Sequence, residues 1–368
     1  MGSAILCRVG ISNTLNVAIV GCGGITLQNH LPGLQLCRDV QVTALCDANA
    51  AVLEKARLQT GAEIVSTQYQ QIVTRDDIHA VIIATPNASH APIALKALEH
   101  GKHVLCEKPL ALNHADAASM AAAADRANVR HMTAFTYRFV PAMRYLSHLV
   151  KRGDFGQPYH FRSCRLQDWG TRSVGWRQVK ALAGTGELGD MLSHRIDFAQ
   201  LLVGPMARLV ANLKQWHAQR GGESNELDDW VAILAEFQNG ATGVLESSKL
   251  ASGRNESWRS LDSVEINGSE GSAVFVTGEW NQLQVGKLGG AGLETLSVPR
   301  EFWTWPGSPR DPSQGDPLVT FRYDQAWEFI DAIRSGRPCT PSFHDGAQAL
   351  AVMDAAVRSA ESRQWVDL

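Results

Sequence analysis

Short hydrophobic runs alternate with helical stretches from Asn16 to about Phe135. The runs are VAIV, VTALCD, AVIIATP, KHVLCE and HMTAF, and the stretches between them place Ala and Leu at helical spacing. Such alternation is typical of parallel strands joined by crossover helices. The clearest helices are expected over 89–100 and 113–128, with Asn113 as the N-cap of the second. This part of the chain is therefore predicted to be an α/β, doubly wound parallel sheet.

The pattern changes after residue 136, where strands follow one another directly. A helix over 141–151 precedes strands over 158–166, 206–216, 228–237, 241–249 and 262–276, and one helix over 188–202 lies among them. Consecutive strands favour antiparallel pairing, so we expect an α+β domain with a large, mostly antiparallel open sheet. Residues 323–368 return to helical spacing, and whether these helices pack back on the first domain is left open. The predicted domains are 16–136 and 137–368.

Length, composition and charge narrow the class of protein. A chain of 368 residues suits two domains, and 45% hydrophobic with 19% charged residues is the balance of a folded globular protein. The 34 basic and 37 acidic residues give a formal charge of -3, so no overall positive field exists to hold a polyanion. Nucleic acid is therefore excluded as a predicted partner.

The cysteines and the apolar runs indicate the cellular compartment in which the protein is expected. The seven cysteines are scattered and form no C-x-x-C pair, which indicates a reducing compartment and no metal site. The first fifteen residues lack the features of a signal peptide, and eighteen apolar residues never run together. A cytoplasmic protein without a membrane partner is predicted.

The strongest local motif is NVAIVGCGGI, a glycine turn that follows a strand and precedes a helix. Gly21 permits the tight turn, and Gly23 lets backbone amides approach a pyrophosphate at a helix N-terminus. The third position of G-x-G-x-x-G is Thr26, but Asp47 closes the second strand where an acid can bind the adenosine ribose. Asp47 would repel a 2'-phosphate, which favours NAD over NADP. The alternative is a turn without a ligand and an Asp that caps the next helix.

A second turn, ATPNASH, ends another predicted strand. Carboxyl ends of parallel strands are where such sheets bind ligands, so four residues there are candidates for cofactor binding: Thr85, Pro86, Asn87 and His90. Asn87 and His90 could equally cap the following helix.

Four motifs in order make the chain resemble the Gfo/Idh/MocA family, named after glucose-fructose oxidoreductase, inositol dehydrogenase and MocA. They are GCGGI at 21–25, ATPNASH at 84–90, CEKPLA at 106–111 and GELGDMLSHRID at 186–197, and RPCTPSFHDGAQALAVMDAAVRSA resembles the closing segment. The resemblance implies a Rossmann domain, a second α/β domain and an NAD-dependent oxidoreductase acting on a sugar, a sugar derivative or a cyclitol. It also adds Gly24, Ile25 and Glu107 to the cofactor-binding candidates.

The resemblance assigns the catalytic groups. Lys108 of Glu-Lys-Pro would contact nicotinamide ribose and substrate, while Asp190 and His194 match the catalytic D-x-x-x-H pair. His194 suits the base that removes a hydroxyl proton during hydride transfer, and Asp190 lies four residues earlier on the same predicted helix face. Lys108 can place a cation beside the developing alkoxide. Leu192 departs from the family, which often has Gly there. The alternative for Asp190 and His194 is a helix-surface hydrogen-bonded pair.

Substrate recognition is expected in RLQDWGTRSVGWRQ at 165–178, because aromatic faces and guanidinium groups suit sugars or anionic groups. By resemblance, Trp176 and Arg177 border the cofactor and the substrate and are cofactor-binding candidates. Trp169 and Arg172 are substrate candidates, with core packing and surface pairing as alternatives. Tyr137, for substrate, and Arg138, for cofactor, follow the predicted strand HMTAF, where a helix start is the competing interpretation. Whether the loop 303–317 forms a lid is left open.

Three functions fit these motifs. The first is an NAD-dependent dehydrogenase or reductase of a secondary hydroxyl or keto carbon. The second is an NAD-dependent glycosidase that oxidises transiently, eliminates the aglycone and recycles bound NAD. The third is a non-catalytic NAD-binding regulator. The resemblance also implies a homo-oligomer, a dimer or tetramer formed through the open sheet.

Overall fold

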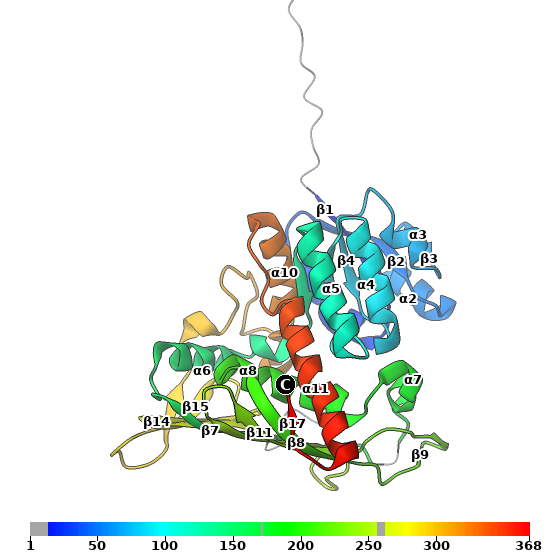
Figure 1. Ribbon diagram of the computed structural model, residues 1–368. Coiled ribbons are helices and arrows are strands. Elements are labelled where there is room, and N and C mark those ends of the chain that lie inside the picture. The colour runs from blue at the N-terminus through cyan, green and yellow to red at the C-terminus, as the bar shows by residue number, and fades with distance from the viewer. Residues whose placement is uncertain (1–13, 171, 256–261) are drawn as a thin grey trace, which may run out of the picture.

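The computed structural model describes residues 14–170, 172–255 and 262–368, which build two large sheets (Figure 1). Cys7 and most of the segment tested for an export signal lie outside these ranges. The first sheet has six parallel strands in the order β3-β2-β1-β4-β5-β6. Their bounds are β1 Leu15–Val20, β2 Val40–Cys46, β3 Ile64–Ser66, β4 Ala80–Ile83, β5 His103–Cys106 and β6 His131–Thr133. Five of the six strands were predicted, and the short β3 was missed.

Crossover helices cover this sheet, as the alternating pattern predicted. They comprise η1 Thr26–His30, α1 Leu31–Gln35, α2 Ala50–Thr60, α3 Gln70–Val73, η2 Asn87–Ser89, α4 His90–Glu99 and α5 His114–Ala127. Asn113 caps α5, because its side chain accepts a hydrogen bond from the Asp116 amide. The doubly wound fold is confirmed.

The second sheet has nine strands in the order β16-β15-β14-β13-β7-β12-β11-β8-β17. Their bounds are β7 Pro158–Leu166, β8 Met206–Lys214, β11 Trp230–Phe237, β12 Thr242–Ser248, β13 Ser263–Gly268, β14 Gly271–Val276, β15 Gln282–Lys287, β16 Glu294–Ser297 and β17 Val366–Asp367. All neighbours pair antiparallel except β7 and β12, so the mostly antiparallel open sheet is confirmed. The predicted strand 262–276 is a hairpin of two strands, and β9 Gln219–Arg220 pairs only with β10 Glu223–Ser224.

Helices lie on one face of the nine-stranded sheet, between it and the first sheet (Figure 1). Among them are α6 Pro141–Arg152, α8 Ser193–Leu202 and α11 Phe343–Ser362. The shorter helices of this part of the chain are η3 Thr136–Phe139, η4 Gly175–Gln178, α7 Lys180–Ala183 and η5 Leu188–Leu192. The predicted helix over 188–202 is not one regular α-helix, because its first turn, η5, is π-helical. Along β11 the inward residues Val231 and Ile233 are buried, whereas Leu234 on the opposite face is 51% exposed.

The C-terminal segment joins the two sheets. α10 Tyr323–Ser335 packs on α1, where Gly33 leaves no room for a side chain: a Cβ there would lie 2.8 Å from the Ala326 Cβ. α11 packs on α5 and on β8, and its first turn is held by a Ser342–Asp345 capping box. The last residues, predicted to be helical, instead add the edge strand β17 to β8. The division of the chain at residue 136 stays a prediction.

The loop 303–317 packs on helices. It follows η6 Arg300–Phe302 and leads into α9 Pro317–Thr320. Arg310 forms an ion pair with Asp324 of α10 at 2.8 Å, and the Trp305 indole donates to Glu328 at 2.6 Å. Trp303 donates to the Val298 carbonyl. Among the described helices, none is long and apolar enough to cross a bilayer.

Replacing the N-cap of α5 tests how much this helix depends on its first turn. Asn113→Ala removes the acceptor for the Asp116 amide, so we expect the free energy of unfolding to fall by about 1 kcal/mol. Asn113→Ser keeps an acceptor and should cost a few tenths of that. Urea denaturation of both variants measures the difference, and equal stability of the two would contradict the capping role.

Candidate active site

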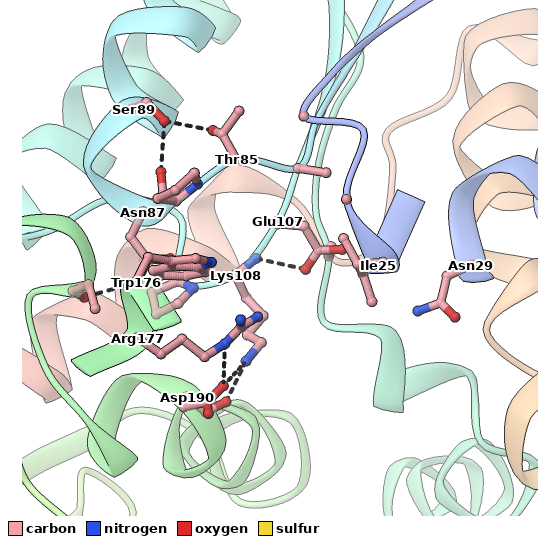
Figure 2. A pocket seen from close by; sticks show the side chains of 18 of the residues that line it. Ile25, Asn29, Thr85, Asn87, Ser89, Glu107, Lys108, Trp176, Arg177 and Asp190 are labelled. Atoms are coloured by element: carbon pink, nitrogen blue, oxygen red, sulfur yellow. Dashed lines mark hydrogen bonds and ion pairs between the residues drawn. The ribbon is translucent and has the colours of Figure 1, made fainter. Parts of the chain in front are cut away.

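A cavity of about 700 Å³ opens between the carboxyl ends of the parallel strands and the helices over the second sheet (Figure 2). One wall comes from the turns that follow all six parallel strands, and the other from residues within 165–169, 176–177 and 183–194. Ligands of doubly wound sheets bind at such carboxyl ends. The cavity gathers most of the predicted site residues: Gly21, Gly23, Gly24, Ile25, Asp47, Thr85, Pro86, Asn87, Glu107, Lys108, Tyr137, Trp169, Trp176, Arg177, Asp190 and His194.

The glycine turn fits a dinucleotide. Gly21 has φ of 95°, and a Cβ there would lie 2.3 Å from the Ala84 carbonyl oxygen, so only glycine is possible. Gly23 has no atom within 4 Å of a Cβ position, which leaves its backbone open to the cavity. Thr26, at the third position of the motif, donates its hydroxyl to the Gly21 carbonyl at 2.6 Å and closes the turn. Thr26 also begins η1, a π-helical turn.

Asp47 ties the second strand to this turn. Its carboxylate accepts from the Cys22 amide at 2.8 Å and from the Asn49 amide at 2.8 Å, and it lines the cavity. Asn49, rather than Asp47, caps α2 through the amides of Ala51 and Val52. An acid beside a glycine turn is the arrangement in which a ribose diol is bound. The alternative that Asp47 is the helix cap is therefore wrong.

Of the four cofactor-binding candidates in the turn after β4, three line the cavity and one does not. Thr85, Pro86 and Asn87 face the cavity, and the Asn87 amide donates to the Ala183 carbonyl at 2.9 Å, which joins the two walls. His90 does not line the cavity. Its ring nitrogens lie 2.9 Å from the carbonyl oxygens of Thr85 and Pro109, and burial lowers the pKa of the imidazole. These bonds hold the His90 ring behind the cavity wall, and its predicted contact with the cofactor stays a prediction.

Lys108 and Asp190 meet across the cavity (Figure 2). The Lys108 ammonium donates to the Asp190 carbonyl and lies 3.4 Å from Asp190 Oδ1. Arg177 Nε lies 3.6 Å from the same oxygen. Glu107, next to Lys108, accepts from His30 Nε2 at 2.9 Å. Lys108, which follows β5, and Asp190, which precedes α8, thus form an ion pair between the two parts of the chain.

The charge of Asp190 is set by its neighbours. Burial acts to raise the pKa of this carboxyl, but Lys108, Lys249 and Arg177 together hold it well below its usual range. Asp190 lies in the π-helical turn η5. The Asp228 carboxylate fixes the start of this turn, because it accepts hydrogen bonds from the amides of Gly186 at 2.7 Å and Leu188 at 2.8 Å. A Cβ on Gly186 would lie 2.1 Å from the Asp228 carbonyl oxygen. Asp190 is therefore an ionised side chain on a tightly held turn.

His194 is neutral and faces the cavity. Its side chain is 3% exposed and stacks on Tyr137 with ring centroids 4.1 Å apart. Burial, reinforced by the nearby Lys108, lowers the pKa of this imidazole well below its usual value. A neutral imidazole in a cavity can accept a proton. Leu192, where the family often has Gly, is fully buried.

Two predicted contacts lie away from the cavity. Arg138 is buried in a bidentate ion pair with Asp197, at 2.8 and 2.5 Å, and reaches Asp345 at 2.8 Å. This pairing explains why Arg138 does not reach the cofactor region, and it makes Asp197 a structural residue. Arg172 lies 4.8 Å above the Trp169 ring at the surface, whereas Trp169 lines the cavity. Arg177 similarly stacks on Trp176 at 4.4 Å, but both of these face the cavity.

Several site residues were missed in the sequence. Arg165 and Gln167 line the cavity together with Trp169, because alternate residues at the end of β7 point the same way. This period-two spacing was available as a signal in RLQDW. Lys249 was also missed; its ammonium lies 3.6 Å from carboxylate oxygens of both Asp190 and Glu187. No spacing rule places Lys249 near Asp190, since 59 residues separate them along the chain.

The chain is similar to known oxidoreductases over most of its length. Residues 15–135 match the model described as oxidoreductase family, NAD-binding Rossmann fold, and 143–274 match the GFO/IDH/MocA C-terminal domain. A levoglucosan dehydrogenase of Pseudarthrobacter phenanthrenivorans is 35% identical, with 88% of each chain covered. A myo-inositol 2-dehydrogenase of Thermotoga maritima is 26% identical over 96% of this chain and 98% of that protein. A solved levoglucosan dehydrogenase in complex with NADH and levoglucosan superposes with TM-score 0.87, 33% identity, and coverage of 96% and 99%.

Substitutions can distinguish the structural role of Arg138 from the cofactor-binding role predicted for Asp47. Arg138→Gln leaves Asp197 buried without its cation, so we expect the free energy of unfolding to fall by about 3 kcal/mol while the Kd for NAD+ stays within about twofold. Asp47→Ala should weaken NAD+ binding by roughly tenfold or more, because charge-assisted hydrogen bonds contribute about 1.5–3 kcal/mol.

Urea denaturation and titration calorimetry measure these two effects. A tenfold loss of NAD+ affinity in Arg138→Gln that remains folded would contradict its structural role.

Proposed function

Because the chain belongs to the Gfo/Idh/MocA family of NAD-binding oxidoreductases, we propose that it transfers a hydride between NAD and a secondary hydroxyl or keto carbon of a sugar, sugar derivative or cyclitol. The observation that carries the proposal is the contact of Lys108 with Asp190 in one cavity with a neutral His194. Lys108, Asp190 and His194 are the proposed catalytic groups. The sugar dehydrogenases among the relatives support this chemistry.

The residues around the glycine turn suit NAD. Gly21 and Gly23 leave the backbone open for a pyrophosphate, and Asp47 presents a carboxylate where a ribose diol would be held and a 2'-phosphate repelled. Thr85, Pro86 and Asn87 line the same wall, with Trp176 and Arg177 opposite. When bound there, NAD+ supplies the hydride acceptor.

The catalytic groups move a proton between the substrate oxygen and the protein. His194, neutral because of its burial, accepts the hydroxyl proton during oxidation and returns it during reduction. The Lys108 ammonium stabilises the developing alkoxide, and Asp190 holds Lys108 in place through its carbonyl and carboxylate. Because His194 is only 3% exposed, little bulk water reaches it, which strengthens these charge interactions.

The relatives and the cavity walls suggest which substrates to try first. The named relatives act on levoglucosan, D-apiose and myo-inositol, and the indole rings of Trp169 and Trp176 offer flat apolar faces for a sugar ring. Levoglucosan is the first compound to try, since that dehydrogenase shares 35% identity with this chain.

A substrate panel with variants tests the function. We expect the wild-type protein to reduce NAD+, followed at 340 nm, with at least one of these polyols. His194→Ala and Lys108→Ala should each lower kcat by roughly 10²–10⁴-fold, because each removes a group that acts on the reacting proton or charge. Lys96→Ala, an exposed lysine paired with Glu99, is the matched control and should retain full activity.

Other outcomes of the panel would replace this function. Cleavage of a chromogenic glycoside without net NADH would favour the redox-neutral glycosidase. Binding of NAD+ with no turnover in any assay would favour the non-catalytic regulator. Full activity of His194→Ala would remove it from the mechanism.

We also propose that the protein is a dimer or tetramer formed through the uncovered face of the nine-stranded sheet. Leu234 is 51% exposed, and it lines a shallow depression on the sheet together with Val210, Ala232 and Val244. Such an exposed apolar surface is typical of a subunit interface.

The cytoplasmic location predicted from the cysteines remains a prediction; the cysteines among the described residues are all free.

The interface is tested by charge insertion. Leu234→Asp places a carboxylate on this face and should shift the mass measured by light scattering toward the monomer. Leu58→Asp, at a 71% exposed position on α2, is the control and should leave the mass unchanged. A monomeric wild-type protein would contradict the proposal.

A further inference from the structure

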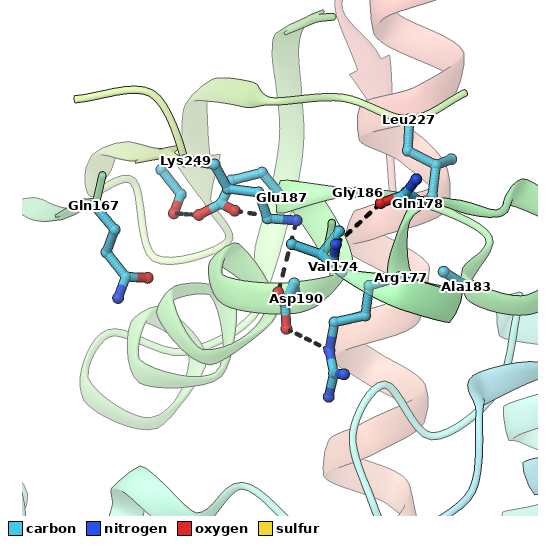
Figure 3. A network of polar contacts seen from close by, with 12 residues as sticks. Gln167, Val174, Arg177, Gln178, Ala183, Gly186, Glu187, Asp190, Leu227 and Lys249 are labelled. Carbon is cyan, nitrogen blue, oxygen red and sulfur yellow. Dashed lines mark hydrogen bonds and ion pairs between the residues drawn. The ribbon is translucent and has the colours of Figure 1, made fainter. Parts of the chain in front are cut away.

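Behind Asp190 lies a buried lysine that the catalytic scheme does not use. Lys249 follows β12, is 2% exposed and does not line the cavity. Its ammonium lies 3.6 Å from Asp190 Oδ2 and 3.6 Å from Glu187 Oε2 (Figure 3). Lys249 thus bridges two carboxylates of the turn that carries Asp190.

The two oxygens of Asp190 face different cations. Oδ1 faces the cavity side, where Lys108 lies at 3.4 Å and Arg177 at 3.6 Å. Oδ2 is buried and has no hydrogen-bond partner among the described residues, so Lys249 is the cation that it faces. The orientation of the carboxylate is therefore defined by a charge on each side.

Glu187 completes the bridge. Its Oε1 accepts from the Ser247 hydroxyl, and its buried Oε2 has no hydrogen-bond partner in the described part of the chain. Asp228, which holds the start of η5, also contributes negative charge near Glu187. Burial raises the pKa of Glu187 to about 7, against the opposing effect of Lys249. Two buried carboxylates this close to one cation would repel each other without it.

We propose that Lys249 is a positioning residue of the active site: by bridging Glu187 and Asp190 it fixes the Asp190 carboxylate with Oδ1 toward Lys108, and so holds the Lys108 ammonium at the substrate oxygen. This inference rests on the proposed oxidoreductase function. Lys249 acts through Asp190 and touches neither substrate nor cofactor. Without Lys249, the Asp190 carboxylate is free to turn both oxygens toward Lys108 or to share a proton with Glu187.

A purely structural lysine is the competing explanation. The backbone of Lys249 already joins two segments, because its amide donates to the Asp229 carbonyl and its carbonyl accepts from the Trp169 amide. These bonds survive a side-chain substitution. A structural lysine would therefore cost stability and activity to the same extent whatever residue stands at position 190.

A double-mutant cycle separates the two explanations. With a sugar that the wild-type protein oxidises, Lys249→Met should lower kcat at least tenfold and leave KM for NAD+ unchanged, and Lys249→Arg should restore most of the loss. In an Asp190→Asn background, Lys249→Met should cost less than about twofold further, since the group it orients is already neutral. An equal loss in both backgrounds would overturn the proposal, as would a fully active Lys249→Met.

Lys102→Met is the matched control for loss of a buried lysine. Lys102 is 5% exposed and donates to the Arg75 carbonyl at 2.6 Å, away from the cavity. Lys102→Met can lower stability but should leave kcat unchanged. A comparable loss of kcat in this variant would mean that the cycle reports stability alone.

Thermal unfolding against pH gives a readout that needs no substrate. An acid whose pKa is raised on folding costs stability as pH rises from its unfolded to its folded pKa. Loss of Lys249 raises the folded pKa of Glu187 further, so the Tm difference between wild type and Lys249→Met should widen as pH rises above about 7. Adding Glu187→Gln should remove this widening.

The two readouts fail in different ways. A Tm difference that is independent of pH would overturn the bridge between Lys249 and the carboxylates. A wild-type protein that oxidises no sugar would overturn the proposed function, and the thermal result would then decide alone whether Lys249 pairs with Glu187.

Discussion

The ion pair between Lys108 and Asp190 is the interaction on which the site depends, because its partners come from the two different parts of the chain. Lys108 follows β5 of the parallel sheet, and Asp190 lies in η5, the turn before α8, which covers the nine-stranded sheet. A buried charge is tolerated only where opposite charge and hydrogen bonds compensate its lost hydration. The cavity is therefore formed only while the two parts of the chain stay in contact.

Other contacts hold the two parts in that relation. Arg138, after β6, pairs with Asp197 on α8 and with Asp345 on α11, so one guanidinium connects three segments. Asn87 reaches the Ala183 carbonyl across the cavity. These fixed contacts leave the proposed catalytic side chains preorganised, which limits the reorganisation that the proposed reaction would require.

Local rules predicted much of the fold but only part of the site. The alternating pattern gave five parallel strands, and Asn113 and Gly21 act where capping and φ preferences placed them. The rest follows from long-range packing. The π-helical turn at Asp190 depends on Asp228, 38 residues away, and Lys249 reaches the site because β12, which it follows, packs against η5. The place of Arg138 outside the cavity could not be predicted, because sequence shows that it follows a strand but not that Asp197 lies beside it.

The strand order of the second sheet has a consequence for the chain as it leaves the ribosome. β7 cannot complete its pairing until β12 and β13 have been made, and β8 receives its last neighbour, β17, from residues 366–367. The parallel sheet, in contrast, has all six strands by residue 133. Pairings distant in sequence form slowly, and domains tend to fold as units from the N-terminus during synthesis. The nascent chain therefore holds every strand of the parallel sheet long before the second sheet can pair, but Phe329 and Ile330 of α10, which complete the core on one face of the parallel sheet, are made only near the end. The two parts of the chain are thus completed together.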